Sequence, residues 1–317
     1  MSDWTQLAAG QTYPPGTLYV VATPIGNVAD LSLRALHVLG LADAIACEDT
    51  RNTGQLLTRV GLQRPLVAVH EHNEREAAVR IVERLQAGER IAYVSDAGTP
   101  GISDPGARLV EAVRAAGLSV VPLPGPSAAV TALSVAGDML EAGEGRFTFV
   151  GFLPGKPKAR QDAIARLAAL DHAWVFYEAP HRIADTLAAL AAGLPGTRRL
   201  LIGRELTKLF EETPLLTVAE APAWLAAEAT RGKGEFVLVV EGAGRAESAG
   251  DDAPDPQAAR VLKLLLAELP AKRAAKLAAA ITGAKTDVLY KLALAQRAGD
   301  AGEGEKEADE DEGEGDA

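Results

Sequence analysis

Three short groups of charged residues have the composition and spacing of acid–base sites. They are Asp49 with Arg51, Glu178 with Arg182, and Glu205 next to Arg204. A carboxylate beside a cation can accept a proton during catalysis, and such charges tend to gather in clefts. The same pairs also fit surface ion pairs, which contribute only about 0.2–0.5 kcal/mol. We predict catalytic roles for Asp49, Arg51, Glu178, Arg182 and Glu205, and the identity of the general base stays open.

Four loops rich in glycine, proline and small residues follow predicted strands. The first loop is TPIGN (23–27), the second is CEDTR (47–51), the third is SDAGTPGISDPG (95–106) and the fourth is PGPSAAV (124–130). Glycine and proline allow tight turns and let the backbone approach a ligand closely. In open α/β sheets, ligands bind at the carboxyl ends of the strands. The four loops together predict one ligand-binding cleft.

Familiar nucleotide and metal motifs fit this sequence poorly. The third loop lacks the G-x-G-x-x-G spacing, and the segment from Gly151 to Lys156 is one residue short of a phosphate-binding loop. NAD and ATP are therefore not expected. His70, Glu71 and His72 have a spacing that allows a metal site, but such a pair at a strand end is more often part of a polar rim. We predict no metal.

The elements that must position these residues alternate between strands and helices. Apolar runs predict strands at 17–23, 43–47, 66–70, 90–96 and 118–123, and periodic segments predict helices at 30–39, 51–60, 73–86 and 106–116. Asp30 is the expected cap of the first helix, and Asn73 with Glu76 forms a variant capping box at the third. This alternation indicates a largely parallel sheet covered on both faces.

The alternation stops near residues 138–145 and then resumes. Further strands are expected at 147–152, 173–178, 199–205 and 235–242, with helices at 157–170, 181–191 and 219–231. The sequence therefore predicts the α/β fold class, with two consecutive α/β domains at residues 17–124 and 125–242. Residues 1–16 are expected to form an irregular N-terminal arm, and the small, polar residues 243–258 a linker.

The net charge of −11 is concentrated at the C-terminus. Residues 299–317 hold ten acidic residues and one lysine, which leaves the other 298 residues at −2. This acidic tail has too few apolar residues to fold alone. Residues 259–298 read as a basic, helix-turn-helix-like appendage: eight bases against Glu268 and Asp287 give it a charge of +6. Without the tail, an objection to nucleic acid as a partner that is based on overall charge nearly vanishes.

Cysteine content and hydropathy exclude other classes of protein. Cys47 is the only cysteine, which rules out internal disulfides and multi-cysteine metal sites. No apolar run approaches the roughly 18 residues of a membrane span, and the first 15 residues lack the pattern of a signal peptide. We therefore predict a cytoplasmic protein.

Several long motifs follow one another along the chain: GTLYVVATPIGNVADLSLRAL (16–36), ACEDTRNTGQLL (46–57), VSDAGTPGISDPG (94–106), PLPGPSAAVTAL (122–133), FVGFLP (149–154), YEAPHR (177–182) and RELTKLFEE (204–212). Together and in this order they resemble the ribosomal RNA small subunit methyltransferase I family, a branch of the tetrapyrrole methylase superfamily. The resemblance extends from about residue 16 to 242, and more loosely to 297. It implies two α/β domains of tetrapyrrole-methylase type with a cleft between them.

The resemblance also implies an activity. The family transfers a methyl group from S-adenosylmethionine to the ribose 2′-hydroxyl of a cytidine in the decoding region of 16S rRNA, within the small ribosomal subunit, as a homodimer. By resemblance, the residues expected around the methyl donor are Pro24, Asp96, Gly98, Gly101, Ile102, Ser127, Ala128 and Tyr177. Glu48, His181, Lys208, Lys233 and Glu235 are further candidates for acid–base roles.

Contacts with RNA are expected from basic residues on the rim and in the appendage. The rim bases are Lys156, Lys158, Arg160 and Arg166. Two other functions stay open: a small-molecule methyltransferase that acts on a tetrapyrrole-type acid, and a non-catalytic RNA-binding protein. The basic appendage disfavours the small-molecule methyltransferase. The loop motifs expected around the methyl donor disfavour the non-catalytic protein. The acidic tail reads either as a phosphate mimic that limits non-specific RNA binding or as a solubilising extension.

Overall fold

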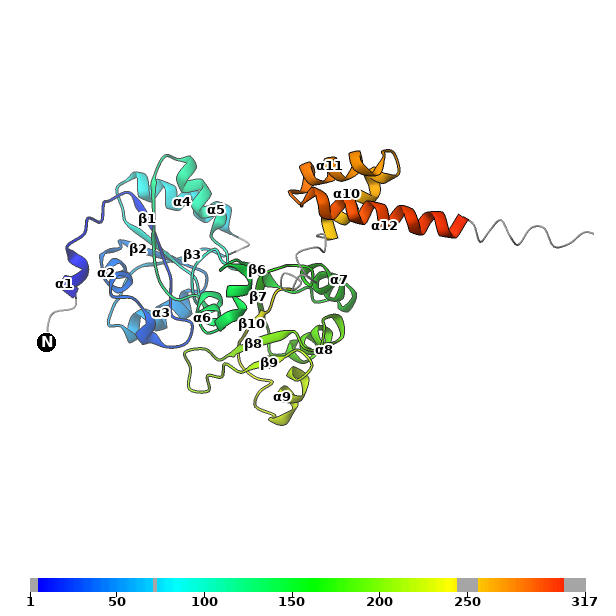
Figure 1. Cartoon of the computed structure of the whole chain (residues 1–317). Helices are drawn as coiled ribbons and strands as arrows, with labels where there is room; N and C mark the ends of the chain where they lie inside the picture. Colours follow the sequence, from blue (N-terminus) through cyan, green and yellow to red (C-terminus); the bar gives the residue numbers. More distant parts are fainter. Residues whose placement is uncertain (1–4, 71–72, 244–255, 305–317) are drawn as a thin grey trace, which may run out of the picture. The chain divides into compact units, whose positions relative to one another are not determined.

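The computed structural model describes residues 5–70, 73–243 and 256–304, which belong to two compact units. The larger unit (Met1–Gly244) contains two five-stranded sheets with their helices, and the smaller unit (Arg245–Ala317) contains three helices (Figure 1). The two sheets are consecutive in the chain, with strands β1–β5 in one and β6–β10 in the other. The larger unit therefore has the predicted α/β class.

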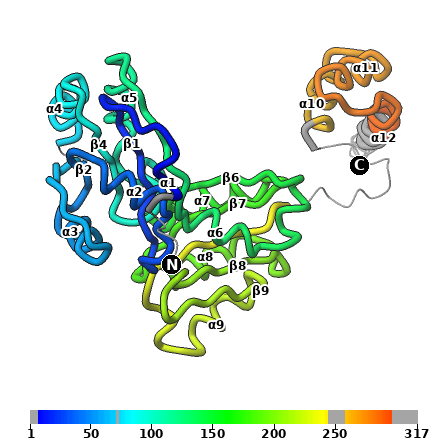
Figure 2. Tube along the Cα trace, turned by 90° about the vertical axis from the view of Figure 1, so that its left-hand side faces the viewer, coloured from blue at the N-terminus to red at the C-terminus, as the bar shows by residue number. Residues whose placement is uncertain are grey.

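The first sheet is entirely parallel, with the strand order β3-β2-β4-β1-β5. Its strands are β1 (Thr17–Val21), β2 (Ala44–Cys47), β3 (Leu66–Ala68), β4 (Ile91–Val94) and β5 (Ser119–Leu123). The helices around it are α2 (Leu33–Leu41), α3 (Thr50–Arg59), α4 (Glu74–Gln86) and α5 (Ala107–Ala115). The helices α2 and α3 cover one face of the sheet, and α4 and α5 cover the other (Figures 1 and 2). Covered on both faces, the central strands are continuously apolar, as predicted.

Two of the predicted helix starts are wrong in detail. Ser32, not Asp30, caps α2, because its Oγ accepts a hydrogen bond from the N–H of Ala35 at 3.0 Å. Asp30 instead ends the 3-10 helix η1 (Val28–Asp30). Asn73 does precede α4, but its side chain bonds back to the N–H of His70 and the carbonyl of Ala68, so no capping box forms.

The second sheet is mixed, with the strand order β6-β7-β10-β8-β9. Its strands are β6 (Phe147–Phe152), β7 (Ala173–Glu178), β8 (Arg199–Arg204), β9 (Leu215–Thr217) and β10 (Phe236–Val240). Only β6 and β7 pair in parallel, because β10 inserts antiparallel between β7 and β8, and β9 runs antiparallel to β8. A largely parallel sheet is therefore correct for the first sheet alone. The sequence analysis also missed β9.

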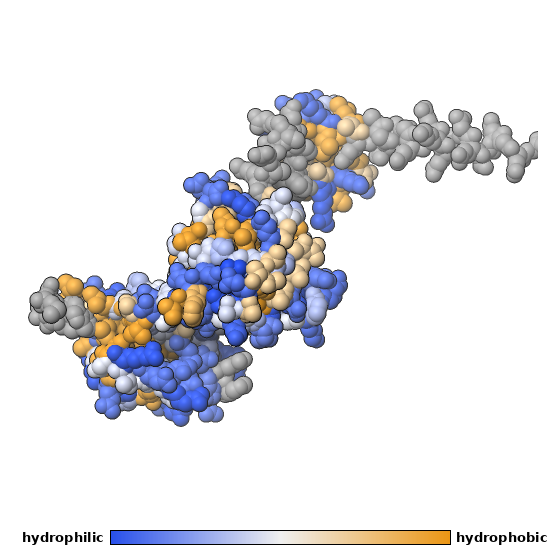
Figure 3. All heavy atoms as spheres, turned by 90° about the horizontal axis from the view of Figure 1, so that it is seen from below, coloured by the Kyte–Doolittle hydropathy of each residue, from blue (hydrophilic) through white to orange (hydrophobic). Residues whose placement is uncertain are grey.

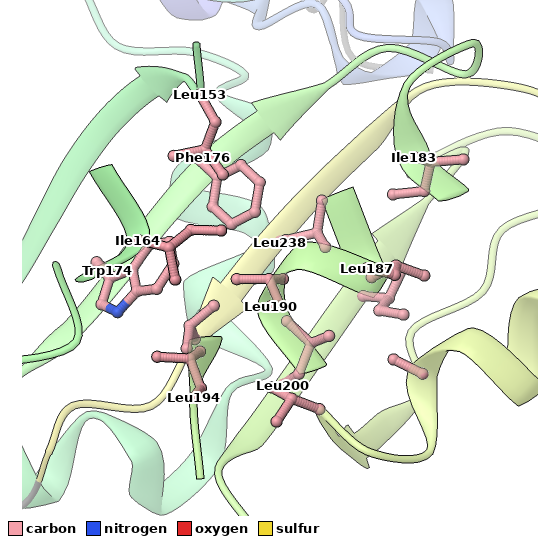
Figure 4. Close-up of a cluster of buried hydrophobic side chains, with 14 of the residues drawn as sticks. Leu153, Ile164, Trp174, Phe176, Ile183, Leu187, Leu190, Leu194, Leu200 and Leu238 are labelled. Atoms are coloured by element: carbon pink, nitrogen blue, oxygen red, sulfur yellow. The ribbon is translucent and has the colours of Figure 1, made fainter. Parts of the chain in front are cut away.

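Helices cover both faces of the second sheet as well. On one face lie α7 (Pro157–Leu167), α8 (Ile183–Gly193) and α9 (Ala221–Ala227), and on the other lies α6 (Ala128–Ser134). Trp174 and Phe176 project from β7 against Ile164, Leu187 and Leu190 in the first of these layers (Figure 4). The α6 layer also includes Ile25 of the first loop, which packs against the second sheet's core. The two sheets thus share a contact next to the first loop.

The N-terminal arm is more ordered than predicted. Residues Thr5–Ala9 form the helix α1, and the buried Tyr13 donates its hydroxyl hydrogen bond to the carbonyl of Ala8 at 2.9 Å. Between the two sheets, the expected pause contains the short 3-10 helices η2 (Gly137–Met139) and η3 (Glu141–Gly143).

The smaller unit is a bundle of α10 (Pro256–Leu266), α11 (Ala271–Thr282) and α12 (Thr286–Gly304). Its core consists of alanines and leucines, among them Leu262, Ala274, Ala278 and Leu289. The helix α10 begins inside the predicted linker, and α12 continues into the predicted tail as far as Gly304. The rest of the linker, through residue 255, and the tail from residue 305 lie outside the described residues.

Candidate active site

A cavity of about 360 Å³ lies between the two sheets of the larger unit. The third and fourth loops and residues of β7 and β10 line it. This volume lies within the range of about 300–1,000 Å³ that is typical of small-molecule sites. Among the predicted donor-binding residues, the lining includes Gly98, Ile102, Ser127, Ala128 and Tyr177.

The remaining predicted site residues lie elsewhere. Of the predicted catalytic residues, only Glu178 belongs to the lining. The lining does not include Pro24, Asp96, Gly101, Asp49, Arg51, Arg182 or Glu205. Pro24, Asp96 and Gly101 nevertheless belong to the first and third loops, whose neighbouring residues do line the cavity.

Backbone hydrogen bonds hold the first, third and fourth loops together. Thr23 and Gly98 exchange two of them, at 2.9 and 3.1 Å, as an isolated antiparallel bridge. The hydroxyl of Thr99 then donates to the carbonyl of Pro126 at 2.9 Å. Gly98 has a φ of +83°, a conformation that glycine adopts without steric cost. The glycine and proline content of these loops therefore serves to join them at one edge of the first sheet.

A buried glutamate fixes the far end of the third loop. Oε1 of Glu74 accepts hydrogen bonds from the N–H groups of Gly106, Arg108 and Leu109 at 3.0, 3.1 and 3.3 Å, so it caps α5 from α4. The Tyr93 hydroxyl donates to the carbonyl of Pro105 at 2.7 Å. Sequence reasoning missed Glu74, because its partners lie more than 30 residues away and no local pattern indicates them.

Gly106 also has a steric requirement. Its φ is +124°, and a Cβ at this position would lie 2.3 Å from the ring of Tyr93. The end of the third loop therefore cannot carry a side chain without displacing a buried aromatic ring. Packing and hydrogen bonds together fix the backbone that follows Asp104 on the cavity wall.

Tyr177 forms an aromatic wall of the cavity, where the resemblance places it. Its ring packs edge-on against Phe149 and Phe152, with centroids 5.1 and 5.8 Å away. Burial raises the pKa of Tyr177, although hydrogen bonds with the backbone of Ala129 and the side chain of Ser127 lower it in part. The phenol therefore stays protonated at neutral pH, and its hydrogen bonds join β7 to the fourth loop.

Asp49, Arg51 and Asp96 organise the second loop. Asp49 caps α3 by accepting from the N–H of Arg51 at 2.8 Å, and it pairs with that guanidinium at 2.6 Å. Hydrogen bonds from Arg51 lower the pKa of Asp49 to about 2, which makes the carboxylate a weak base. Asp96 accepts from the N–H of Asp49 and from the amide of Asn52, at 3.2 and 2.8 Å. The three side chains therefore tie the second loop to the third.

Glu178 and Arg182 connect β7 to α8. The carboxylate of Glu178 is buried, lies 3.1 Å from Nε of Arg182 and accepts from the Thr186 hydroxyl at 2.6 Å and the N–H of Ala179 at 2.9 Å. Arg182 also donates to the carbonyl of Leu153, next to β6. These partners hold the carboxylate of Glu178 in a fixed position on the cavity wall.

Glu205 belongs to a network that joins its loop to the first loop. The ammonium of Lys208 bridges Glu205 and Glu235 at 2.8 Å each, and Oε1 of Glu205 also accepts from the N–H of Glu235 at 2.9 Å. Burial raises the pKa of Glu205, but these hydrogen bonds outweigh that effect and leave the pKa lowered. Burial lowers the pKa of Lys208, yet its two carboxylate partners leave it raised. Neither group is therefore suited to act as a base.

The same network explains one glycine of the first loop. A Cβ on Gly26 would lie 2.5 Å from Cγ of Lys208, and the N–H of Asn27 donates to the Thr207 hydroxyl at 3.1 Å. The first loop and residues 204–212 can approach this closely only because position 26 has no side chain.

Sequence reasoning did not single out Asp104, although the motif SDPG contains it. Asp104 lines the cavity. Burial raises its pKa to about 6, the negative charges of Glu48 and Asp96 add to this effect, and a hydrogen bond with Ser95 opposes it in part. The local sequence gives no sign of this shift, because the burial comes from elements distant in the chain.

The cavity wall is acidic. Asp104, Glu178 and Glu235 line it, and the described lining includes no lysine, arginine or histidine. Such a wall favours a ligand that carries positive charge. The described residues include no group of three or more metal-ligating side chains. Glu71 and His72 of the segment discussed above lie outside the described residues.

The bases expected to contact RNA differ in exposure. Lys156, Lys158 and Arg166 are exposed, but Arg160 is only 4% exposed, with its guanidinium 3.4 Å from Thr186 and 3.6 Å from Asp185. The prediction for Arg160 is therefore wrong: its position on α7 turns it toward α8. In the smaller unit, the described basic side chains are all exposed: Arg260, Lys263, Lys272, Arg273, Lys276, Lys285 and Lys291.

Comparison with known proteins agrees with this architecture. The family described as Tetrapyrrole (Corrin/Porphyrin) Methylases matches residues 17–222, and the RsmI C-terminal HTH domain matches residues 252–297. Among solved structures, the methyltransferase CobJ has a TM-score of 0.54 and 21% identity, covering 72% of this chain and 95% of its own. A cobalt precorrin-4 methyltransferase has a TM-score of 0.51 and 13% identity, covering 72% and 98%. At these identities, the two structures establish the fold alone.

Curated relatives are much more similar. A protein of Xylella fastidiosa (strain Temecula1) named ribosomal RNA small subunit methyltransferase I is 50% identical over 276 residues, which cover 87% of this chain and 98% of the relative. The protein of the same name from Escherichia coli O157:H7 is 49% identical over 282 residues, covering 89% and 96%. With its fold, its sequence motifs and its C-terminal bundle, the chain belongs to the ribosomal RNA small subunit methyltransferase I family of the tetrapyrrole methylases.

Proposed function

We propose that the protein transfers a methyl group from S-adenosylmethionine to the ribose 2′-hydroxyl of a cytidine in the decoding region of 16S rRNA. The observation that carries this proposal is the acidic cavity formed by the family's loop motifs, in a chain whose relatives are named ribosomal RNA small subunit methyltransferases. The finer assignment to a cytidine 2′-hydroxyl follows from the sequence resemblance.

The cavity has the chemistry that S-adenosylmethionine requires. The donor carries a positive sulfonium and an ammonium group, and Glu178 and Glu235 supply negative charge on the wall. The third and fourth loops offer backbone groups, and Phe152 and Tyr177 offer aromatic surface. We infer that these residues hold the donor, with Pro24, Asp96 and Gly101 fixing the loops around it.

Methyl transfer from a sulfonium needs little activation of the donor. The protein's contribution is to align the hydroxyl with the methyl group, to exclude water and to accept the proton of the hydroxyl. The hydrogen bonds among the first, third and fourth loops provide a rigid frame for this alignment. Asp49, Arg51, Arg182 and Glu205 then act by positioning loops, because each bonds to residues beside the cavity without lining it.

An rRNA substrate fits the charge pattern better than an acidic tetrapyrrole does. The carboxylates of a tetrapyrrole would face three carboxylates on the cavity wall. An RNA would place only a ribose and its base there, and its phosphates would contact exposed bases such as Lys156 and Lys158 and the basic bundle. We infer that the bundle contributes to the binding of 16S rRNA in the small subunit.

We further propose a homodimer, located in the cytoplasm with its substrate. Large hydrophobic side chains stay exposed on the larger unit, including Leu209 (89%), Phe210 (66%) and Val130 (59%). Figure 3 shows hydrophobic residues gathered in patches between hydrophilic ones on one face. Exposed apolar surface of this kind is typical of contacts between chains. Among the described helices, none has both the length and the hydropathy needed to cross a membrane.

The experiment that tests the function is a map of ribose methylation. We expect 16S rRNA from a strain that lacks this protein to lose one 2′-O-methyl group on a cytidine of the decoding region, and expression of the chain to restore it. Purified protein with labelled S-adenosylmethionine should methylate small subunits from that strain. An unchanged methylation map, with no transfer by the purified protein, would reject the proposal.

A further inference from the structure

The three carboxylates of the cavity wall differ in their partners. Glu178 lies 3.1 Å from the guanidinium of Arg182, and Glu235 lies 2.8 Å from the ammonium of Lys208. Asp104 forms no salt bridge within the described part of the chain. A carboxylate that already neutralises a cation is a poor proton acceptor, because protonation would break that pair. Asp104 is free of this penalty.

The neighbours of Asp104 favour its protonated form. The titratable groups that face it are Glu48 after β2, Asp96 after β4, Tyr93 on β4 and Tyr177 on β7. None of these four carries a positive charge. Together with burial, the acidic neighbours raise the pKa of Asp104 to about 6, against the hydrogen bond from Ser95. A general base works best when its pKa lies near the operating pH, since it is then ionised yet still holds a proton well.

Asp104 also stands on a fixed backbone. The carbonyl of Pro105 accepts from Tyr93 at 2.7 Å, and the N–H of Gly106 donates to the buried Glu74 at 3.0 Å. On its other side, Ser103 has a φ of +62°, a conformation that costs energy for a residue with a side chain. Strained backbone held in place from both sides is typical of groups that must be pre-positioned.

We propose that Asp104 is the general base that accepts the proton of the ribose hydroxyl during methyl transfer. This inference rests on the proposed function. The O–H bond breaks and its proton moves to a carboxylate oxygen of Asp104, while the hydroxyl oxygen bonds to the methyl carbon of the sulfonium donor. The carbon–sulfur bond breaks, and its electron pair stays on sulfur as a neutral thioether. No oxidant or reductant takes part.

The first test is a single-turnover measurement with the full chain, saturating S-adenosylmethionine and unmethylated small subunits. We expect D104N to lower the rate of the chemical step at least about 100-fold, the usual contribution of a general base. The dissociation constant of S-adenosylmethionine from D104N, measured by calorimetry, should differ less than about threefold from that of the wild type, because most of the donor's contacts remain. E111Q is the control, since Glu111 is an exposed acid on α5 that does not line the cavity.

The second test is the pH dependence of the same rate, which needs no variant. The wild-type rate should fall with acid as a group of pKa near 6 becomes protonated, and the residual rate of D104N should lack this limb. D104E, which keeps the carboxylate, should recover part of the rate that D104N loses. A purely structural role for Asp104 would not remove the loss of rate in acid from D104N. Nor would it let the second carboxylate variant, D104E, recover part of the rate.

Three results would overturn the proposal. They are a D104N rate within tenfold of the wild type, an acid limb that persists in D104N, and a wild-type rate that does not vary between pH 5 and 8. A large loss of donor affinity in D104N would also overturn it, because Asp104 would then bind the donor. Failure of the proposed function is distinct, since the wild-type protein would then methylate no rRNA at all.

Discussion

At the scale of single residues, the same charged groups can anchor a loop or perform chemistry, and their partners decide which. Asp49 has a pKa of about 2 because Arg51 bonds to it, and Glu205 is held by Lys208. Asp104 has acidic neighbours and no ion pair within the described residues, so its charge is costly to maintain. Groups left in unfavourable surroundings by the fold are the strongest candidates for catalysis.

Because the ionised carboxylate of Asp104 is costly in its surroundings, replacing it by asparagine should stabilise the folded chain at a pH where the carboxylate is ionised. Its pKa is near 6 in the folded chain and near 4 in an unfolded one, so the folded state binds the proton more tightly. The contribution of this proton to the stability of the folded chain is complete below pH 4 and is lost as the pH rises through 6. We therefore expect D104N to unfold at a higher temperature than wild type at pH 8.

Thermal unfolding followed by circular dichroism at pH 4 and at pH 8 measures this difference, with E111Q as the control. The advantage of D104N should disappear at pH 4, where the wild-type carboxyl is protonated as well. A D104N chain less stable than wild type at pH 8 would show that the ionised Asp104 is stabilised by its surroundings.

At the scale of elements, the cavity depends on contacts between loops and helices that are distant in sequence. The isolated bridge between Thr23 and Gly98 joins the first and third loops. Glu74 projects from α4 to cap α5, and so holds the end of the third loop. A carboxylate at a helix N-terminus is favoured by both its hydrogen bonds and the helix dipole. The two helices that cover one face of the first sheet therefore also fix the loop that carries Asp104.

Replacement of Glu74 by glutamine tests this element-scale role. Glutamine keeps the shape but loses the charge, so we expect E74Q to lower the free energy of unfolding by about 1–2 kcal/mol. The affinity for S-adenosylmethionine should fall as the third loop loses its support. Denaturant unfolding and calorimetry measure the two effects.

E76Q provides the comparison, because Glu76 is an exposed acid on the same first turn of α4. It should leave both the stability and the donor affinity close to wild type. Equal effects of E74Q and E76Q would show that charge on α4, and not the cap of α5, is responsible.

At the scale of the whole molecule, charge is divided among segments with different tasks. Residues 1–258 carry a net charge of −8 and contain the acidic cavity, the C-terminal bundle exposes bases and carries +6 over residues 259–298, and residues 299–317 carry −9. An acidic cavity suits a cationic donor, and a basic bundle suits the phosphates of RNA. The net charge of −11 describes none of these surfaces.

Two truncations test this division of tasks. A chain that ends at Ala243 lacks the basic bundle, so its affinity for small subunits should fall at least about tenfold while its donor affinity stays the same. A chain that ends at Gly304 keeps the bundle and lacks the acidic residues that follow. If those residues act as a phosphate mimic, it should bind unrelated RNA more tightly than the full chain does.

Filter binding at two salt concentrations measures these affinities, and calorimetry measures the donor. Unchanged subunit binding by the chain that ends at Ala243 would assign RNA recognition to the larger unit. Unchanged binding of unrelated RNA by the chain that ends at Gly304 would support the solubilising role of the tail.

The sequence by itself determined the features that depend on local patterns. Apolar runs and turn residues located nine of the strands, and the glycine-rich segments marked the loops that form the cavity. The periodicity of residues 259–297 indicated the helical bundle. The long motifs identified the family, because their residues are contiguous and can be read without a structure.

Tertiary structure alone decided the properties that arise from residues distant in the chain. Strand direction in the second sheet follows from the insertion of β10 between β7 and β8, which no local pattern records. The cap that Glu74 provides and the burial of Arg160 depend on neighbouring helices. The raised pKa of Asp104 depends on burial, on the charge of Glu48 in the second loop and on the charge of Asp96 at the other end of its own loop. Electrostatic energy and burial depend on distance in space, and only the folded chain sets that distance.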